Sequence, residues 1–212
     1  MSIQILFEDK YLLAIDKPKG ISSDGQYGIE QQVRDYLNSL SFGNKLITGM
    51  PHRLDKPVSG ILLFVKKRQA LKDINKQFAQ KTIKKIYKAR VQGLLNEKEK
   101  TLYHFLVIDK KNKKAIISHT AIKKSFPVAL SYKVLMEQSD SSLLEVELHT
   151  GKFHQIRAQL AFIGHPIVGD VKYGANSSYL NNDSISLHAF KLVFMHPVEN
   201  NIVEIVSENN DI

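Results

Sequence analysis

The segment from residue 51 to 60 combines charged side chains in a pattern that could do chemistry. It places one carboxylate, Asp55, in a turn bounded by proline and glycine, with Arg53 before it and Lys56 after it. Neighbouring cations favour the ionised form of a carboxyl group, so we expect Asp55 to be a carboxylate at neutral pH. An ionised carboxylate suits a nucleophile or a base and not a proton donor. The apolar run over 61–65 predicts a strand buried on both faces directly after this loop.

A second segment, from 149 to 160, is also dense in polar side chains. We predict that a strand ends at His149, that Gly151 turns the chain and that a helix begins near Phe153. Backbone N–H groups at the start of a helix attract anions, and Lys152 would add a positive charge. A P-loop is excluded, because that motif requires a glycine where this chain has Val146.

Two further side chains admit more than one interpretation. Arg157 lies at the edge of the apolar face of the predicted helix, next to Ile156. Its guanidinium could pair with Asp55 in a bidentate manner, or it could extend along the helix surface into solvent. Tyr87 lies in an alternating segment whose neighbours on the same face are apolar. It is either a tyrosine of the core or a ring that stacks on a nucleic acid base.

The sequence contains no pattern that predicts a metal ion or a cofactor. Five histidines fall between His149 and His196, but none forms a metalloprotease pair and the chain has no cysteine. Histidines held by hydrogen bonds are the simpler interpretation. Ser59 has a glycine only after it, so no nucleophile elbow surrounds it. No glycine-rich nucleotide fingerprint follows a predicted strand, so we expect no cofactor and no metal.

Positive charge is concentrated in the middle of the chain. The net charge is +9, yet residues 198–212 contain acidic residues and no lysine or arginine. The basic residues of the middle are Lys66, Lys67, Arg68, Lys81, Lys84, Lys85, Lys88, Arg90, Lys110, Lys111, Lys113, Lys114, Lys123 and Lys124. Such a region favours a polyanionic partner such as nucleic acid, and a solvated lysine-rich surface is the alternative.

The composition is typical of a globular protein with a substantial core. The absence of cysteine excludes disulfides and thiolate metal sites. Residues 1–4 lack the basic and apolar regions of a secretory signal, and no apolar run approaches the length of a membrane span. We therefore expect a cytoplasmic protein.

The hydrophobic pattern predicts many strands and few helices. Strands are predicted at 3–8, 11–16, 61–65, 85–93, 101–109, 114–118, 128–136, 144–148, 187–195 and 202–207. Helices are predicted at 28–40, 71–78 and 153–163. We expect an α+β protein with a mixed, mostly antiparallel central sheet and flanking helices.

Taken together, these segments resemble the RluA family of RNA pseudouridine synthases, which isomerise specific uridines in ribosomal and transfer RNA. The resemblance covers residues 3–197 and follows the order of motifs in that family. The matching motifs are His52-Arg53-Leu54-Asp55 with Ser59-Gly60, Lys85-Ile86-Tyr87-Lys88-Ala89, Thr150-Gly151 with His154-Gln155-Ile156-Arg157, Gly164-His165-Pro166-Ile167 with Gly169-Asp170 and Tyr173-Gly174, Leu187-His188-Ala189 with His196-Pro197, and Asp16-Lys17-Pro18 with Gly20.

The resemblance implies a role for each motif and the pseudouridine synthase fold. Asp55 would break the C1′–N1 bond, Tyr87 would stack on the uracil, and Arg157 would pair with Asp55. Arg53 would enter the RNA stack at the place of the flipped uridine. No cofactor or metal is implied. The residues expected to contact RNA are Arg53, His52, Lys152, His154, Lys88 and Arg90.

Three positions depart from the pattern of the family. Val58 stands where threonine is usual, Lys152 where arginine is common, and Gln159 where histidine is frequent. Lys152 can still meet a phosphate, but without the fork of an arginine. These changes concern the choice of substrate more than the reaction.

The resemblance also implies a domain organisation. We expect a single catalytic domain over residues 1–212, with two lobes around a central RNA-binding cleft and without the S4-type RNA-binding domain of many relatives. RNA would then be bound by the catalytic domain itself, as a monomer. Two other functions stay open: a catalytically inactive protein for RNA binding or ribosome assembly, and a hydrolase or nucleotide-sugar enzyme that uses Asp55.

Overall fold

The computed structural model describes residues 3–40, 49–176 and 184–208. Contacts between residues divide the chain into two compact units. Unit 1 runs up to Lys84 and resumes at Ala189, and unit 2 runs from Lys85 to His188. The single catalytic domain with lobes around a cleft stays a prediction.

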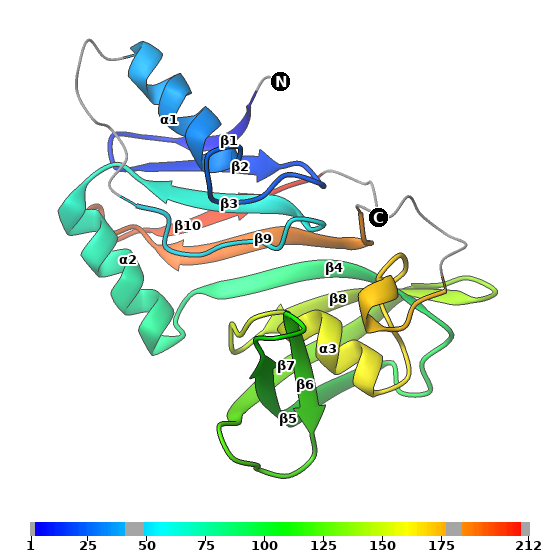
Figure 1. The fold of residues 1–212 in the computed structure, drawn as a ribbon. Helices are drawn as coiled ribbons and strands as arrows, with labels where there is room; N and C mark the ends of the chain where they lie inside the picture. The colour runs from blue at the N-terminus through cyan, green and yellow to red at the C-terminus, as the bar shows by residue number, and fades with distance from the viewer. Residues whose placement is uncertain (1–2, 41–48, 177–183, 209–212) are drawn as a thin grey trace. The chain divides into compact units, whose positions relative to one another are not determined.

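Unit 1 is built from strands of the sheet and, among its described residues, two helices (Figure 1). Its strands are β1 (Gln4–Glu8), β2 (Leu12–Lys17), β3 (Ser59–Val65), most of β9 (Leu187–Met195) and β10 (Ile202–Val206). They follow the order β1, β2, β3, β9, β10, and β1–β2, β2–β3 and β9–β10 pair antiparallel. The helices are α1 (Ile29–Leu40) and α2 (Arg68–Gln80).

The core of unit 1 lies between its strands and α2. All seven residues of β3 are buried, as the continuous apolar run predicted. Ala70 and Ile74 on one side of α2 pack into the same core cluster as Leu63 and Leu192. The spacing of four residues between Ala70 and Ile74 is what places both on one face of the helix.

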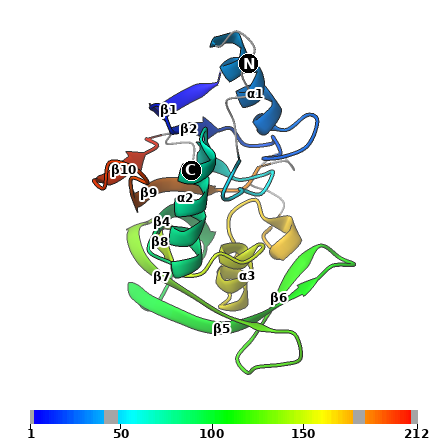
Figure 2. The same cartoon turned by 90° about the vertical axis from the view of Figure 1, so that its left-hand side faces the viewer.

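Unit 2 is an antiparallel sheet that carries one helix (Figure 2). Its elements are nearly all of β4 (Lys84–Gln92), β5 (Glu99–Asp109), β6 (Lys114–Ser118), β7 (Phe126–Glu137), β8 (Ser141–Leu148), α3 (Gln155–Phe162) and a short 3₁₀ turn, η1 (Val171–Tyr173). The strand order is β4, β8, β7, β5, β6, with every pair antiparallel. Helix α3 packs against β5 and β6.

The predicted α+β class, mostly antiparallel with flanking helices, is confirmed. Each predicted strand and helix is present, with ends shifted by a few residues. The largest consequence of such a shift is at α3, which begins at Gln155 and not near Phe153. His154 adopts a left-handed conformation, φ 53°, and such a residue ends the helical geometry on that side. Among the described residues, no helix is long and apolar enough to cross a membrane.

Gly60 in β3 has a steric reason to be glycine. Its φ is 110°, a region that side chains with a Cβ rarely adopt. A Cβ atom here would lie 2.4 Å from the carbonyl oxygen and 2.6 Å from the amide nitrogen of Ala189 in β9. The close approach of β9 therefore requires glycine directly after Ser59, five residues beyond Asp55.

We expect Gly60→Ala to destabilise the protein more than Gly20→Ala. Gly20 also has a positive φ, 80°, but no described heavy atom lies within 4 Å of the position that a Cβ would take there. Backbone strain alone should lower the free energy of unfolding by about 1–2 kcal/mol at Gly20. The clash with Ala189 should add roughly 1–3 kcal/mol at Gly60. Urea unfolding of both variants measures this, and equal losses would show that the clash is relieved without strain.

Candidate active site

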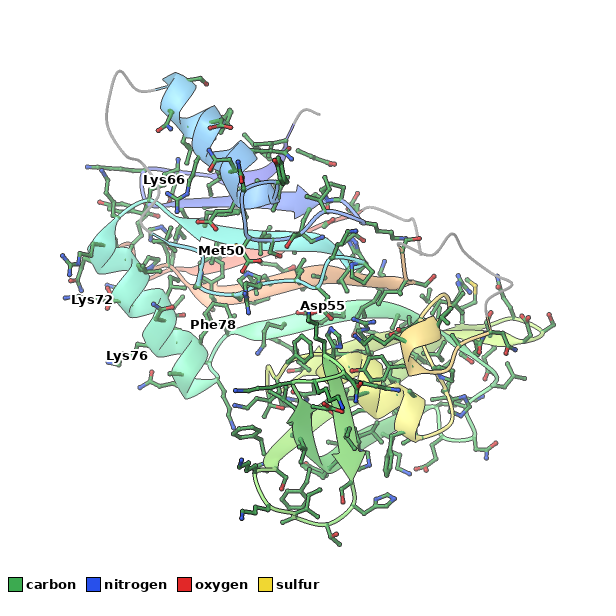
Figure 3. The ribbon with its side chains drawn as sticks, in the orientation of Figure 1. Met50, Asp55, Lys66, Lys72, Lys76 and Phe78 are labelled. Carbon is green, nitrogen blue, oxygen red and sulfur yellow. The ribbon has the colours of Figure 1, made fainter. Side chains whose placement is uncertain are left out.

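Asp55 lies in a loop of unit 1 that leads into β3 (Figure 3). The Asp55 loop, residues 52–58, is closed by a hydrogen bond from the amide of Val58 to the carbonyl oxygen of Asp55, 3.0 Å long. Asp55 itself is half-buried, while Leu54 before it and Val58 after it are buried. The carboxylate is thus presented at the surface by a backbone that is anchored on both sides.

Ser23 anchors the Asp55 loop on its N-terminal side. The Ser23 hydroxyl donates to the carbonyl oxygen of Leu54 at 2.7 Å and accepts from the amide of Leu54 at 3.0 Å. Both polar groups of the residue before Asp55 are therefore satisfied by one buried side chain. The sequence analysis did not select Ser23. It lies 31 residues from Leu54 in the chain, so its role becomes visible only when the fold brings the two residues together.

Lys17 anchors the same loop on its C-terminal side. Its side chain is fully buried, and its ammonium group donates to the carbonyl oxygens of Pro18, Ile21 and Lys56 at 2.8, 2.9 and 3.4 Å. Burial lowers the pKa of Lys17 from 10.5 to about 8, opposed by attraction to the carboxylates of Asp55 and Asp16. A buried cation that holds the loop therefore also acts electrostatically on Asp55.

The two residues before Leu54 have partners of their own. The Arg53 guanidinium pairs with Asp24, and this hydrogen bond lowers the pKa of the Asp24 carboxyl. The Arg53 side chain remains 66% exposed, so its predicted entry into RNA stays open to test. His52 accepts a 3.1 Å hydrogen bond from the amide of Leu63 through Nε2, and its ring lies 5.3 Å from that of Phe78. Contact of His52 with RNA stays a prediction.

Arg157 is buried and paired within unit 2. Its Nε and Nη2 atoms donate to Oδ2 and Oδ1 of Asp170 at 2.7 and 2.9 Å. The alternative of an arginine extended into solvent is wrong, because only 5% of Arg157 is exposed. The bidentate pair is made with Asp170, a motif residue that the sequence analysis did not assign as a partner of Arg157. Asp55 belongs to unit 1, and its pairing with Arg157 stays a prediction.

His154 lies next to this ion pair and is neutral. Burial, followed by the positive charges of Arg157 and Lys172, lowers the pKa of His154 to about 3. Its Nδ1 atom lies 2.9 Å from the Tyr173 hydroxyl, which already accepts the amide hydrogen of Ala115. That hydroxyl can therefore donate its own proton to Nδ1. The predicted contact of His154 with RNA would involve a neutral ring and not a cation.

Strand β4 carries the predicted Tyr87, Lys88 and Arg90. Tyr87 is half-buried, unlike the fully buried Ala89 on the same strand. Lys88 lies opposite Glu145 of β8 in the register. Arg90 donates through Nη1 to the side-chain oxygen of Gln138 at 3.1 Å. The roles of Tyr87 in stacking and of Lys88 and Arg90 in RNA binding stay predictions.

The turn before α3 is organised by a buried amide network. Gln155 accepts hydrogen bonds from the Lys152 amide and the Thr150 hydroxyl at 3.1 and 2.8 Å. Its own amide group donates to Gln159, which contacts His104 at 3.0 Å. Gln159, where the family often has histidine, is thus a fully buried and hydrogen-bonded side chain.

Lys152 is exposed, with its ammonium nitrogen 4.4 Å from the centre of the Phe126 ring. It stands before the start of α3, where the amide of Gln155 already donates to the carbonyl oxygen of Lys152 at 3.1 Å. This bond occupies one N–H group of the predicted anion site. Anion binding by Lys152 at this turn stays a prediction.

One group of described side chains has the spacing of metal ligands: Asp9, His196 and Glu199. Both ring nitrogens of His196 are already used. Nε2 lies 2.8 Å from Asp9 Oδ2, and Nδ1 accepts the amide hydrogens of Val198 and Glu199. His196 therefore fits the interpretation of a histidine held by hydrogen bonds.

Solved structures with the same arrangement of elements define the class of this fold. The human RNA pseudouridylate synthase domain containing 1 and domain containing 4 proteins each superpose with a TM-score of 0.80 at 23% identity. The match covers 97% of this chain and 83% and 88% of theirs. The fold is thus that of pseudouridylate synthase domains.

The family follows from the sequence match. The model of the RNA pseudouridylate synthase family matches residues 11–162, and the chain belongs to this family. Ribosomal large subunit pseudouridine synthase C of Buchnera aphidicola is 36% identical over 95% of this chain and 66% of that protein. The uncharacterized RNA pseudouridine synthase YhcT of Bacillus subtilis is 34% identical over 95% of this chain and 67% of that protein. The chain therefore spans about two thirds of the length of these relatives. The predicted resemblance to RNA pseudouridine synthases is confirmed.

Removal of the Ser23 hydroxyl should loosen the Asp55 loop. In Ser23→Ala the amide and carbonyl of Leu54 lose a buried partner, which should lower the free energy of unfolding by about 1–3 kcal/mol. The Leu54 amide should also exchange its hydrogen faster, as measured by hydrogen exchange. Ser22→Ala is the matched control, because within the described part of the chain the Ser22 hydroxyl has one side-chain partner, Asp24, at 3.4 Å. Equal exchange at Leu54 in both variants would rule out the role given to Ser23.

The lowered pKa of Lys17 predicts a stability that depends on pH. Between about pH 8 and 10.5 the unfolded chain keeps the Lys17 proton that the folded protein has lost. The unfolded state then binds more protons, so the contribution of Lys17 to stability rises with pH in this window. Urea unfolding should show that the wild-type protein gains stability relative to Lys17→Met from pH 8 to 10. A difference that stays constant would contradict the lowered pKa.

Proposed function

We propose that this protein is an RNA pseudouridine synthase that isomerises specific uridines in ribosomal RNA, transfer RNA or both. The observation that carries the proposal is the Asp55 loop, in which a family motif presents one carboxylate on a backbone held by Ser23 and Lys17. The names of the relatives, which include ribosomal large subunit pseudouridine synthase C, support ribosomal RNA as a substrate.

The proposed reaction uses one carboxylate and needs no co-reactant. The target uridine is flipped out of the RNA stack, which exposes its glycosidic bond. If Asp55 is the nucleophile, it bonds to C1′ as the C1′–N1 bond breaks, and this ester bond breaks again when C5 attacks C1′. If Asp55 is the base, it takes up a proton of the ribose as the C1′–N1 bond breaks and returns it when C5 attacks C1′. The uracil turns, a bond forms between C5 and C1′, and the proton on C5 moves to N1. Substrate and product have the same atoms, so the reaction requires no oxidant, reductant or cofactor.

The remaining side chains are assigned by their place in the family motifs. Tyr87 stacks on the uracil and keeps it from leaving while it turns. The family motif assigns Arg157 as the partner of Asp55, and this pairing is part of the proposal. Arg53 fills the gap in the RNA stack, which its exposure of 66% permits. We place the protein in the cytoplasm, as a monomer that binds RNA.

Asp55→Asn should abolish pseudouridine formation and leave RNA binding intact. Asparagine has nearly the same shape but cannot act as a nucleophile or base, so the rate should fall by at least roughly 10²–10⁴-fold. Chemical mapping of pseudouridine in transcripts of ribosomal and transfer RNA treated with each protein measures the rate.

The control for that variant is its affinity for the same transcripts, which should match the wild type, and its thermal unfolding, which should stay cooperative with only a small loss from the missing attraction to Lys17. A variant that forms pseudouridine at the wild-type rate would exclude Asp55 as the catalytic group. A wild-type protein that binds both RNAs without forming pseudouridine would exclude the proposed function.

A further inference from the structure

The two helices of unit 1 carry different patterns of charge. On α1, Glu30 and Arg34 form an ion pair of 2.5 Å four residues apart, and Asp35 adds a second acidic group. On α2, the positions with the same spacing are Arg68, Lys72 and Lys76, all exposed cations. We call these three residues the α2 basic face. Within the described parts of the chain, none of the three takes part in an ion pair.

The α2 basic face disfavours the helix that carries it. Like charges four residues apart repel one another on a helix surface, so Arg68 with Lys72 and Lys72 with Lys76 both destabilise α2. The acidic residue of the helix, Asp73, accepts a hydrogen bond from Gln69. Interactions between charges on α2 therefore do not account for this row of cations, whereas an anionic partner would.

The other side of α2 limits what that partner can be. Ala70 and Ile74 are fully buried, and Leu71 and Phe78 pack against the same core of unit 1. A basic helix that binds a membrane surface needs a free apolar face to insert, and here that face is already used. Figure 3 shows Lys72 and Lys76 on the outer side of α2. The exposed side therefore offers charge without apolar surface, which suits a polyanion.

We propose that the α2 basic face binds the sugar–phosphate backbone of the RNA substrate. Successive cations are separated by one step of four residues, about 6 Å along the helix axis. The row can thus contact successive phosphates of one strand and add affinity that does not depend on sequence. The proposal rests on the proposed function and extends the RNA contacts to a helix outside the family motifs.

Lys72→Glu separates RNA binding from folding. The new carboxylate would stand four residues from both Arg68 and Lys76, so two repulsive pairs become attractive ones. The melting temperature should stay equal or rise. Binding to an in vitro transcript of bacterial large-subunit ribosomal RNA should weaken by roughly 3–10-fold at low salt, and the slope of log K against log salt should fall by about 0.7 or more. KM for the transcript should rise while kcat at saturating RNA stays the same.

Lys100→Glu is the matched control, with the same change in net charge. Lys100 is an exposed lysine of β5 that forms an ion pair with Glu97, so it is already neutralised by the protein. This variant should lose stability and bind the transcript with an affinity within about twofold of wild type. Lys72→Glu should therefore lose affinity for the transcript and keep its stability, whereas Lys100→Glu should lose stability and keep its affinity.

Three outcomes would overturn the proposal. The affinity for the transcript and its salt slope could be unchanged in Lys72→Glu, or Lys100→Glu could lose as much affinity as Lys72→Glu. In the third outcome, Lys72→Glu would weaken binding to phosphatidylglycerol vesicles but not to the transcript. If the wild-type protein forms pseudouridine in any of these cases, the proposed function stands without the α2 basic face. Conversely, a wild-type protein that forms no pseudouridine but binds the transcript through Lys72 would contradict the proposed function alone.

Discussion

The buried ammonium group of Lys17 is the interaction on which the Asp55 loop depends. It joins two stretches of chain, because it donates to the carbonyl oxygens of Pro18 and Ile21 on one side and of Lys56 on the other. A charge without such partners could not be buried. The Lys17 ammonium therefore positions the Asp55 loop, and the carbonyl oxygen of Lys56 in that loop in turn helps to make the burial of the ammonium possible. This mutual requirement ties the backbone next to Asp55 to the segment that carries Lys17.

In unit 2, a buried ion pair likewise joins two segments of the chain. Arg157 and Asp170 are almost fully buried and satisfy each other through two hydrogen bonds. Such a pair adds little to stability compared with apolar residues, but the loss of one partner leaves a buried charge unsatisfied. His154 beside this pair is neutral, because burial first and then the positive charge of Arg157 lower the pKa of its ring. Charged groups held in this way need little reorganisation to act electrostatically on a neighbouring group.

The surface follows a different rule from these buried sites. Exposed lysines of unit 2 such as Lys98, Lys100 and Lys133 stand beside glutamates of the same unit. The three cations of the α2 basic face have no such partners within the described residues. Paired charges are already neutralised locally and attract RNA weakly, whereas a row of unpaired charges of one sign keeps its full field. Net charge alone therefore says less about where a polyanion could bind than the pairing of each lysine does.

The sequence by itself determined the class of fold, the strand after Asp55 and the family motifs. Hydrophobic periodicity depends on neighbours in the chain, so β3 and α2 could be predicted without any tertiary contact. Asp55 could be selected because proline, glycine and cations surround it locally. Only the tertiary structure distinguished Ser23 from Ser22, gave Arg157 the partner Asp170 and made His154 neutral. These properties depend on burial and on partners that the folded chain brings together from distant positions. A local pattern of residues therefore cannot predict them.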